Sequence, residues 1–137
     1  MGARGRHGAR RLLLQALYQR QVGGHDTAEL IDQYSATKEF EAIDGEYFLT
    51  LLTEIAADTA ALEIHIAAAA DRPVEQLDPI ERSVLWIGVI ELEAHTDIPA
   101  KVIINEAIEL AKEFGAQDSY RYINAILDKA AGELRPA

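Results

Sequence analysis

Cysteine is absent from this 137-residue chain, so disulfides and thiolate chemistry are excluded. A chain without cysteine suits a reducing cytosol, although many exported proteins also lack cysteine. We expect a cytoplasmic protein, but this absence does not establish the compartment. Long apolar runs are absent as well: the longest, from Val84 to Ile90, is far shorter than the roughly 20 residues that span a bilayer. The three leucines after Arg10 and Arg11 imitate an export signal only briefly, because Gln15 breaks the run. We therefore expect a soluble protein with no membrane partner.

Motifs of catalysis are also lacking. None of the four histidines follows a glutamate by three residues, which is the spacing of helical di-metal sites, and no histidine pair has the spacing of a zinc site. The three serines lie outside any Gly-x-Ser-x-Gly context, and no glycine-rich phosphate loop is present. We therefore predict a protein that is not an enzyme and that uses neither a metal nor a cofactor.

Acidic residues do not begin until Asp26, although the chain as a whole has a net charge of −10. The residues before Asp26 include five arginines, so the remainder carries −15, the difference between −10 and five positive charges. A basic end on an acidic chain indicates an anion-binding segment, for which nucleic acid is the usual ligand, or a merely solvated terminus. Charge alone leaves both interpretations open. The arginines are Arg4, Arg6, Arg10, Arg11 and Arg20.

Apolar residues recur at spacings of three and four throughout, and no segment alternates strictly, which predicts an all-α fold. A single domain is expected over residues 1–137. We predict a flexible basic arm over 1–8, loosened by Gly5 and Gly8, an N-terminal lobe over 9–71 and a C-terminal lobe over 74–134. The predicted helices cover about 6–22, a short segment capped by Asp26 or Thr27, about 45–70, 78–92, a segment from Pro99 to Gly115 and a last segment after Asp118.

The clearest predicted boundary is at Asp78. Its carboxylate can accept from the backbone amide of Glu81, the Glu81 side chain can reach back, and Pro79 suits the first turn. The helix that follows is apolar around almost its whole circumference. It should therefore be the central and most buried helix.

Single-stranded RNA binding needs cations for phosphates and exposed aromatic rings for unstacked bases, and the chain offers both. Arg11 and Tyr18 are seven residues apart and therefore share one side of the first helix. Tyr122 lies beside the apolar Ile123 and Ile126. Each tyrosine could be a core residue at the edge of an apolar face or a stacking surface.

Three stretches make the chain resemble the NusB transcription antitermination family: "RHGARRLLLQALYQ" from Arg6, "LDPIERSVLWIGVIEL" from Leu77 and "DIPAKVIINEAIELAKEFGAQDSYRYINAILDKAA" from Asp97. The resemblance covers essentially the whole chain. It implies an all-helical fold of two three-helix lobes that binds the boxA element of nascent RNA together with the ribosomal protein NusE. The complex would join other Nus factors on RNA polymerase during ribosomal RNA transcription. Whether the free protein is a monomer or a homodimer is left open.

The resemblance also implies site residues. Tyr122 matches an aromatic position that is usually phenylalanine, and His7 stands where arginine is common, which would make RNA binding modestly pH-dependent. Glu81 and Asp118 match acidic positions at the partner and RNA-proximal surfaces, and each could equally be a helix-start residue. Ala125 replaces a usual glycine. The predicted RNA contacts are Arg4, Arg6, His7, Arg10, Arg11, Tyr18, Asp118 and Tyr122, and the predicted NusE contacts are Tyr18 and Glu81.

Two other functions are compatible with parts of this sequence. NusB-like helical domains also occur at the front of some RNA methyltransferases, but those need an additional α/β domain with a glycine-rich cofactor loop, which does not fit within this chain. The other alternative is a protein-interaction module in which the arginines bind nothing. Measuring boxA RNA binding with and without the partner would separate it from an RNA-binding factor.

Overall fold

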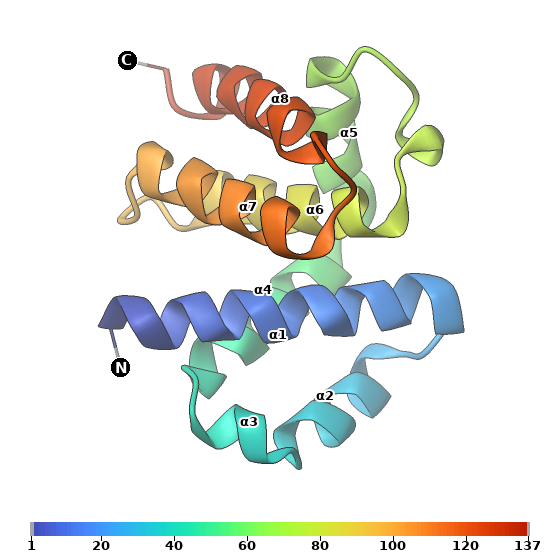
Figure 1. Ribbon diagram of the computed structural model, residues 1–137, viewed down its shortest axis with the longest axis vertical. Helices are drawn as coiled ribbons and strands as arrows, with labels where there is room; N and C mark the ends of the chain where they lie inside the picture. The colour runs from blue at the N-terminus through green and yellow to red at the C-terminus, as the bar shows by residue number, and fades with distance from the viewer. Residues whose placement is uncertain (1, 137) are drawn as a thin grey trace. The chain divides into compact units, whose positions relative to one another are not determined.

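The computed structural model describes residues 2–136, and every regular element among them is a helix (Figure 1). The predicted all-α fold is confirmed. Among these residues no helix is both long and apolar enough to cross a membrane. The elements are α1 (Gly2–Gly23), α2 (Thr27–Ser35), α3 (Lys38–Glu41), α4 (Gly45–Ala57), α5 (Thr59–Ala69), the 3-10 helix η1 (Val74–Gln76), α6 (Pro79–Ala94), α7 (Ala100–Phe114) and α8 (Ser119–Leu134).

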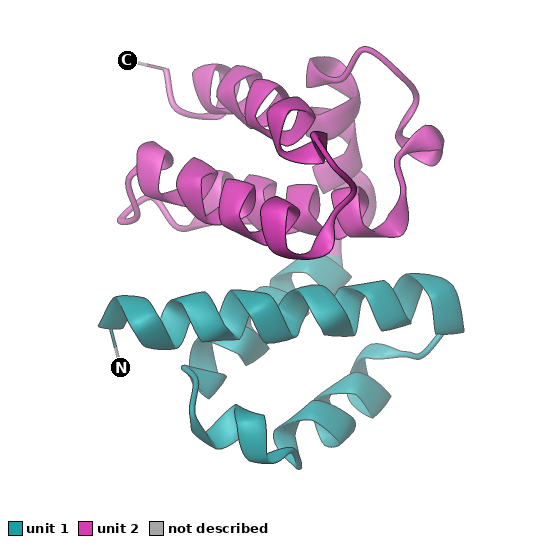
Figure 2. Ribbon diagram, viewed as in Figure 1, with its two compact units in different colours: residues 1–57 teal, residues 58–137 magenta. Residues whose placement is uncertain are grey.

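The chain divides into two compact units, residues 1–57 and 58–137 (Figure 2). In the first unit, α1 packs against α4 and α2, and α2 also packs against α4. Leucines of α1 meet apolar residues of α2 and α4 in a core from which water is excluded, and each such side chain contributes roughly 1.5–3 kcal/mol of transfer free energy. The largest fully buried side chains here are Leu13, Leu14, Leu17, Leu30, Phe48, Leu51, Leu52 and Ile55.

The helix α1 begins at Gly2, four residues before the predicted start at Arg6, so residues 2–8 are its first turns and not a separate arm. The two glycines of this segment have a packing role. The carbonyl oxygen of Gly5 accepts a hydrogen bond from the amide of Asp44 at 3.0 Å. A Cβ atom on Gly8 would lie 2.5 Å from Cγ2 of Ile43. Gly8 therefore lets the segment between α3 and α4 approach α1 closely, which is a different use from the flexibility that the sequence suggested. At Gly5 the contact is made by the backbone carbonyl, which any residue offers.

We expect Gly8→Ala to lower the free energy of unfolding by about 1–2 kcal/mol, because the added methyl group overlaps a β-branched side chain that cannot swing aside. Gly132→Ala is the matched control: Gly132 lies inside α8, and its added Cβ would meet no neighbouring atom within 4 Å. Higher helix propensity should make that change neutral or stabilising by up to about 1 kcal/mol. Urea denaturation measures both, and equal effects would show that the contact with Ile43 does not matter.

The predicted single helix over 45–70 is wrong, because the chain has two helices there, α4 and α5. Asp58 separates them with non-helical backbone angles, φ −155° and ψ 70°. Its carboxylate accepts from the amide of Ala61 at 3.1 Å and so caps α5. The break also changes the boundary between the two halves of the chain. The predicted N-terminal lobe, residues 9–71, included α5, whereas in the structure α5 belongs to the second unit.

In the second unit, α6 packs against α5, α7 and α8. Eleven of its 16 residues are buried, so the prediction that it is the central helix is confirmed. The predicted capping box is present: the amide of Glu81 donates to Asp78 at 2.8 Å, and the amide of Asp78 donates to Glu81 at 3.2 Å. Arg82 ties α6 to α5 through Glu63, with an N–O distance of 2.6 Å. The start of the core helix is thus fixed from two sides.

The other end of α6 is held by Arg135, which follows α8. Its guanidinium donates hydrogen bonds to backbone carbonyl oxygens at the C-terminus of α6 and in the turn before α7, at distances from 2.5 to 3.1 Å. The last carbonyl groups of a helix have no partner within the helix. Arg135 supplies a donor to Leu92 and Ile98, and it adds a second donor to Glu91 and His95, whose carbonyl oxygens also accept backbone amides. The four acceptors are the carbonyl oxygens of Glu91, Leu92, His95 and Ile98.

Candidate nucleic-acid interface

Because the basic N-terminal segment is helical, the spacing of its residues decides which side chains lie on the same face of α1. Arg4, His7, Arg11 and Tyr18 recur at spacings of three, four and seven, so they share one face of α1. We call this set the α1 stripe. At 1.5 Å per residue it is about 21 Å long. Arg4 is exposed, His7 and Arg11 are half-buried, and Tyr18 is 41% exposed. The predicted pairing of Arg11 and Tyr18 on one side is confirmed.

Two other predicted RNA contacts face elsewhere. The guanidinium carbons of Arg6 and Arg10 lie 4.6 and 5.6 Å from the ring centre of Tyr47 on α4. Arg6 is half-buried and keeps part of its surface, whereas Arg10 is only 3% exposed. The prediction that Arg10 contacts RNA is therefore wrong for this conformation, because so little of its guanidinium surface is open to a phosphate. Its placement among buried residues makes it part of the core.

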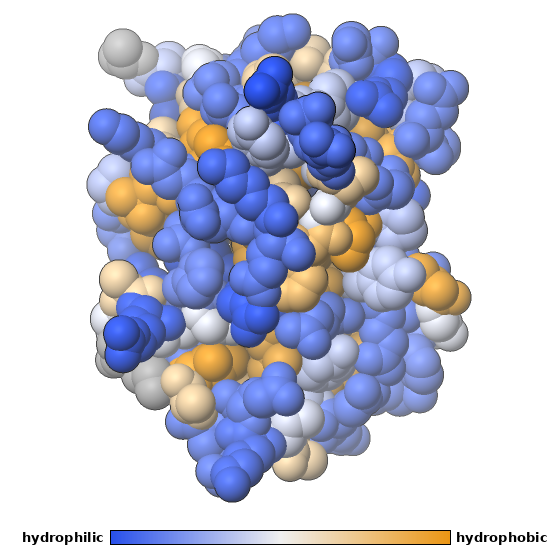
Figure 3. Space-filling view, in the orientation of Figure 1, coloured by the Kyte–Doolittle hydropathy of each residue, from blue (hydrophilic) through white to orange (hydrophobic). Residues whose placement is uncertain are grey.

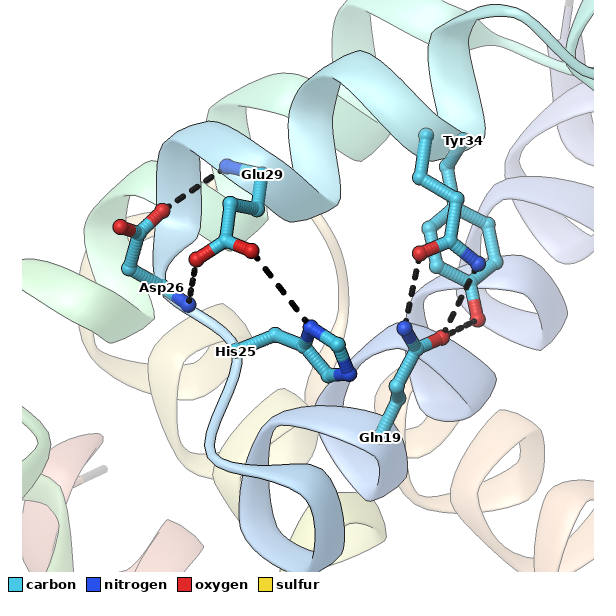
Figure 4. A network of polar contacts seen from close by, with 6 residues as sticks. Gln19, His25, Asp26, Glu29 and Tyr34 are labelled. Atoms are coloured by element: carbon cyan, nitrogen blue, oxygen red, sulfur yellow. Dashed lines mark hydrogen bonds and ion pairs between the residues drawn. The ribbon is translucent and has the colours of Figure 1, made fainter.

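A network of polar side chains, which includes Gln19 next to Tyr18 in the sequence, joins α2 to α1 (Figure 4). The side-chain amide of Gln19 donates to Gln33 at 2.7 Å and its oxygen accepts from the Tyr34 hydroxyl at 2.9 Å. Burial raises the pKa of Tyr34, so the hydroxyl stays protonated and keeps donating. The loop before α2 is closed by the capping box of Asp26 and Glu29. Tyr18 itself projects from α1 as an exposed ring, which removes the core interpretation for this tyrosine.

Tyr122 on α8 is half-buried, and both interpretations of it hold in part. The guanidinium carbon of Arg72 lies 4.1 Å from its ring centre, which is a close cation–π contact. Burial raises the pKa of Tyr122, and the nearby Arg72 charge offsets part of that rise. Within residues 2–136 the buried hydroxyl makes no well-aligned hydrogen bond. The ring thus has a buried polar end and a face that already carries a cation.

The two acidic positions have different roles. Glu81 is 8% exposed and its carboxylate is used in the α6 cap, so the helix-start interpretation is confirmed for this residue. Asp118 precedes α8 but makes no side-chain cap hydrogen bond. It has a positive φ of 69°, alone among the non-glycine residues from 2 to 136. Its carboxylate lies 3.8 Å from Nε of the exposed Arg121. A structural cap therefore does not explain Asp118.

Several groups near these positions were missed in the sequence. Arg72 is 50 positions away from Tyr122, and no local pattern connects them. The run Tyr120-Arg121-Tyr122 alternates aromatic and basic residues at the start of α8, and this signal could have been found. Lys112 from the last turn of α7 also lies on the Tyr120 ring, with Nζ 4.9 Å from its centre. The start of α8 thus carries ring–cation contacts at both Tyr120 and Tyr122.

The rest of the described surface could hold two other kinds of site, a metal site or a large apolar patch. In the described part of the chain, no group of three histidine or acidic side chains is placed to hold a metal ion. On the face seen in Figure 3, hydrophilic residues dominate and the apolar patches between them are small. The fold and these surfaces define an all-helical protein whose exposed arginines and tyrosines are the groups that single-stranded nucleic acid binding uses.

Comparison with known proteins places this chain more closely. The sequence model of the NusB family matches residues 7–132. Transcription antitermination protein NusB of Alcanivorax borkumensis is 43% identical over 132 residues, which cover 96% of this chain and 88% of the relative. The protein of the same name from Hydrogenovibrio crunogenus is 45% identical over 126 residues, covering 92% and 78%. The solved structure of T. maritima NusB matches with a TM-score of 0.85 at 26% identity, covering 96% and 93%. The chain belongs to the NusB family.

Proposed function

We propose that this protein is an RNA-binding transcription antitermination factor that binds boxA RNA together with NusE and joins other Nus factors on RNA polymerase during ribosomal RNA transcription. The names of the relatives support the antitermination role. The α1 stripe is the observation that supports the RNA contact, because it places two arginines, a histidine and an exposed aromatic ring on one face of a rigid helix.

In this proposal, the cations of the α1 stripe attract the phosphates and Tyr18 stacks with a base. Arg6 adds charge from a different face of α1, since it keeps part of its surface while resting on Tyr47. A helix holds these groups in a fixed order, so little ordering entropy is lost when RNA binds. The remaining chain is strongly acidic and repels RNA wherever cations are not concentrated, which favours binding at the basic segment.

The second unit contributes contacts of its own. Tyr122 offers an aromatic face near the start of α8, and a base can stack there if Arg72 moves aside or remains as an additional cation. Asp118 stands close in sequence and holds Arg121. Two weak contacts on one strand add to useful affinity, because the second forms at high effective concentration once the first is made.

For the protein partner, we propose that NusE contacts the end of the α1 stripe. Tyr18 and Val22 are one helical turn apart, and they are 41% and 61% exposed. Exposed large apolar side chains of this kind are typical of protein interfaces. Glu81 supports the partner surface only indirectly, because its carboxylate fixes the start of α6 and is nearly buried.

The salt dependence of RNA binding tests the stripe. Three or four phosphate contacts by Arg4, Arg6, His7 and Arg11 predict a log–log slope of about −2 to −3 for a single strand. Arg4→Ala should lower the slope magnitude by about 0.7, whereas Lys38→Ala, which removes one positive charge from α3, should leave it unchanged. Fluorescence anisotropy with labelled boxA RNA between 50 and 300 mM salt measures this. Affinity independent of salt would rule out the stripe as the anchor.

The main competing function is a protein-interaction module that does not bind RNA. It predicts that NusE binds equally well with and without boxA RNA. The proposed factor predicts that each ligand strengthens the binding of the other, because linkage is reciprocal. Titrating NusE in the presence and absence of RNA separates the two.

A further inference from the structure

The second unit is strongly acidic, and three of its seven cations lie on the tyrosine rings at the start of α8. Residues 58–137 contain seven lysines and arginines against fifteen aspartates and glutamates. Two of the cations serve the fold, since Arg82 binds Glu63 and Arg135 binds carbonyl groups of α6. Of the other five, three lie on the rings of Tyr120 and Tyr122 at the start of α8. The cations left over, Lys101 and Lys129, make no ring contact in the described structure.

Tyr120 has two of these three cations. Nζ of Lys112 lies 4.9 Å from its ring centre, and the guanidinium carbon of Arg121 lies 5.7 Å from it. Arg121 also donates from Nε to the Tyr120 hydroxyl at 3.2 Å. The Arg121 side chain is 73% exposed, Lys112 is exposed and Tyr120 is half-buried. An aromatic ring flanked by two solvent-accessible cations is thus present at the junction of α7 and α8.

Asp118 holds Arg121 in place beside the Tyr120 ring. Its carboxylate lies 3.8 Å from Nε of Arg121, and its left-handed backbone starts the first turn that carries Tyr120. A non-glycine residue in this conformation is strained, and such strain is found preferentially where function requires a particular geometry. The absence of a side-chain cap leaves the carboxylate available to orient Arg121.

We propose that Tyr120, Lys112 and Arg121 form an additional contact site for single-stranded RNA, at which one base stacks on Tyr120 and the adjacent phosphate binds Lys112 and Arg121. The proposal rests on the proposed RNA-binding function and extends it to residues outside the α1 stripe. Stacking on an aromatic ring tolerates any base, and cations beside the ring hold the phosphate of the stacked nucleotide. In a unit with a large excess of acidic residues, RNA would be repelled unless cations were concentrated at the contact.

The ring is tested by Tyr120→Ala and Tyr120→Phe in the full-length protein. Loss of stacking should weaken boxA RNA binding by about 5-fold or more in the alanine variant, whereas phenylalanine keeps the ring and should bind within about 2-fold of wild type. A strand with 2-aminopurine at successive positions should show quenching at one position that is lost only in Tyr120→Ala. Unchanged affinity and unchanged quenching in that variant would overturn the proposal.

The cations are tested by a pair of double variants with equal charge. Lys112→Ala with Arg121→Ala should lower the magnitude of the log–log salt slope by about 1.4, which corresponds to two lost phosphate contacts. Lys101→Ala with Lys129→Ala removes the same charge away from the ring and should leave the slope near wild type. Equal changes in both double variants would mean that only net charge matters, which would overturn the proposal. Circular dichroism confirms that all variants are folded.

The outcome also separates this inference from the proposed function. If Arg4→Ala weakens RNA binding while the Tyr120 and Lys112–Arg121 variants bind as wild type, the additional site is refuted and the α1 stripe stands. If the wild-type protein binds no boxA RNA even with NusE present, the proposed function itself is refuted. The additional site at Tyr120 is then refuted with it.

Discussion

Replacing Arg135 with alanine should lower the free energy of unfolding by about 2–4 kcal/mol. The guanidinium donates four hydrogen bonds to carbonyl groups of α6 and of the turn before α7. A hydrogen bond from a charged donor is worth about 1.5–3 kcal/mol, but these bonds are partly exposed and water can replace some of them in the variant. The loss is large against a typical total stability of about 5–15 kcal/mol. Thermal and urea denaturation measure it.

Arg135→Lys provides the sharper comparison. Lysine keeps the charge but has a single donor centre, so it cannot reach carbonyl groups that a planar guanidinium spans in several directions. We expect an intermediate loss of stability. Lys129→Ala, on the exposed side of α8, should change stability by less than about 0.5 kcal/mol. If Arg135→Ala were as mild as Lys129→Ala, the carbonyl groups would be satisfied by water and the end of α6 would not depend on this side chain.

The parts of the fold that local signals specify could be predicted from the sequence. The start of α6 is an example, because Asp78, Pro79 and Glu81 lie within four residues and each favours the same boundary. The break at Asp58 could not be predicted in the same way. One aspartate among alanines and leucines also fits the exposed side of a continuous helix, and the high helix propensity of its neighbours favours that interpretation. Tertiary packing decides between the two.

The site was partly predictable for a similar reason. The stripe of Arg11 and Tyr18 follows from helical periodicity alone, and the structure extends it to Arg4 because α1 continues back to Gly2. The burial of Arg10 depends instead on Tyr47, which lies 37 positions further along the chain. The cation on Tyr122 depends on Arg72, which is 50 positions away in the sequence. Periodicity assigns residues to faces, but only packing shows which face is covered.

The glycines at the start of α1 show how one residue type supports opposite interpretations. In a basic terminal segment, Gly5 and Gly8 suggest a flexible arm. In the structure both lie within α1: Gly8 allows the close approach of Ile43, and the carbonyl oxygen of Gly5 accepts from the amide of Asp44. This packing changes the expected mechanism of RNA binding, because cations on a preformed helix lose less conformational freedom than cations on an arm that folds around its ligand.

Tyr122→Ala should weaken boxA RNA binding by about 1–3 kcal/mol, or roughly 5- to 150-fold, if a base stacks on this ring. Its matched control is Tyr122→Phe. That variant keeps the ring under Arg72 and removes a buried hydroxyl that makes no well-aligned hydrogen bond within residues 2–136. Phenylalanine should therefore bind RNA as wild type and be equally or slightly more stable.

Arg72→Ala shows which face of Tyr122 the base uses. If the base displaces the guanidinium, Arg72→Ala leaves the ring uncovered, and this gain offsets the loss of one nearby positive charge. Affinity should then change by less than about 2-fold. If the base stacks on the free side and Arg72 stays in place, affinity should fall, because a cation over the opposite face strengthens the ring contact. Equal RNA affinity of wild type and a folded Tyr122→Ala variant would show that this tyrosine serves only the core. Any contribution of α8 to RNA binding would then depend on Tyr120.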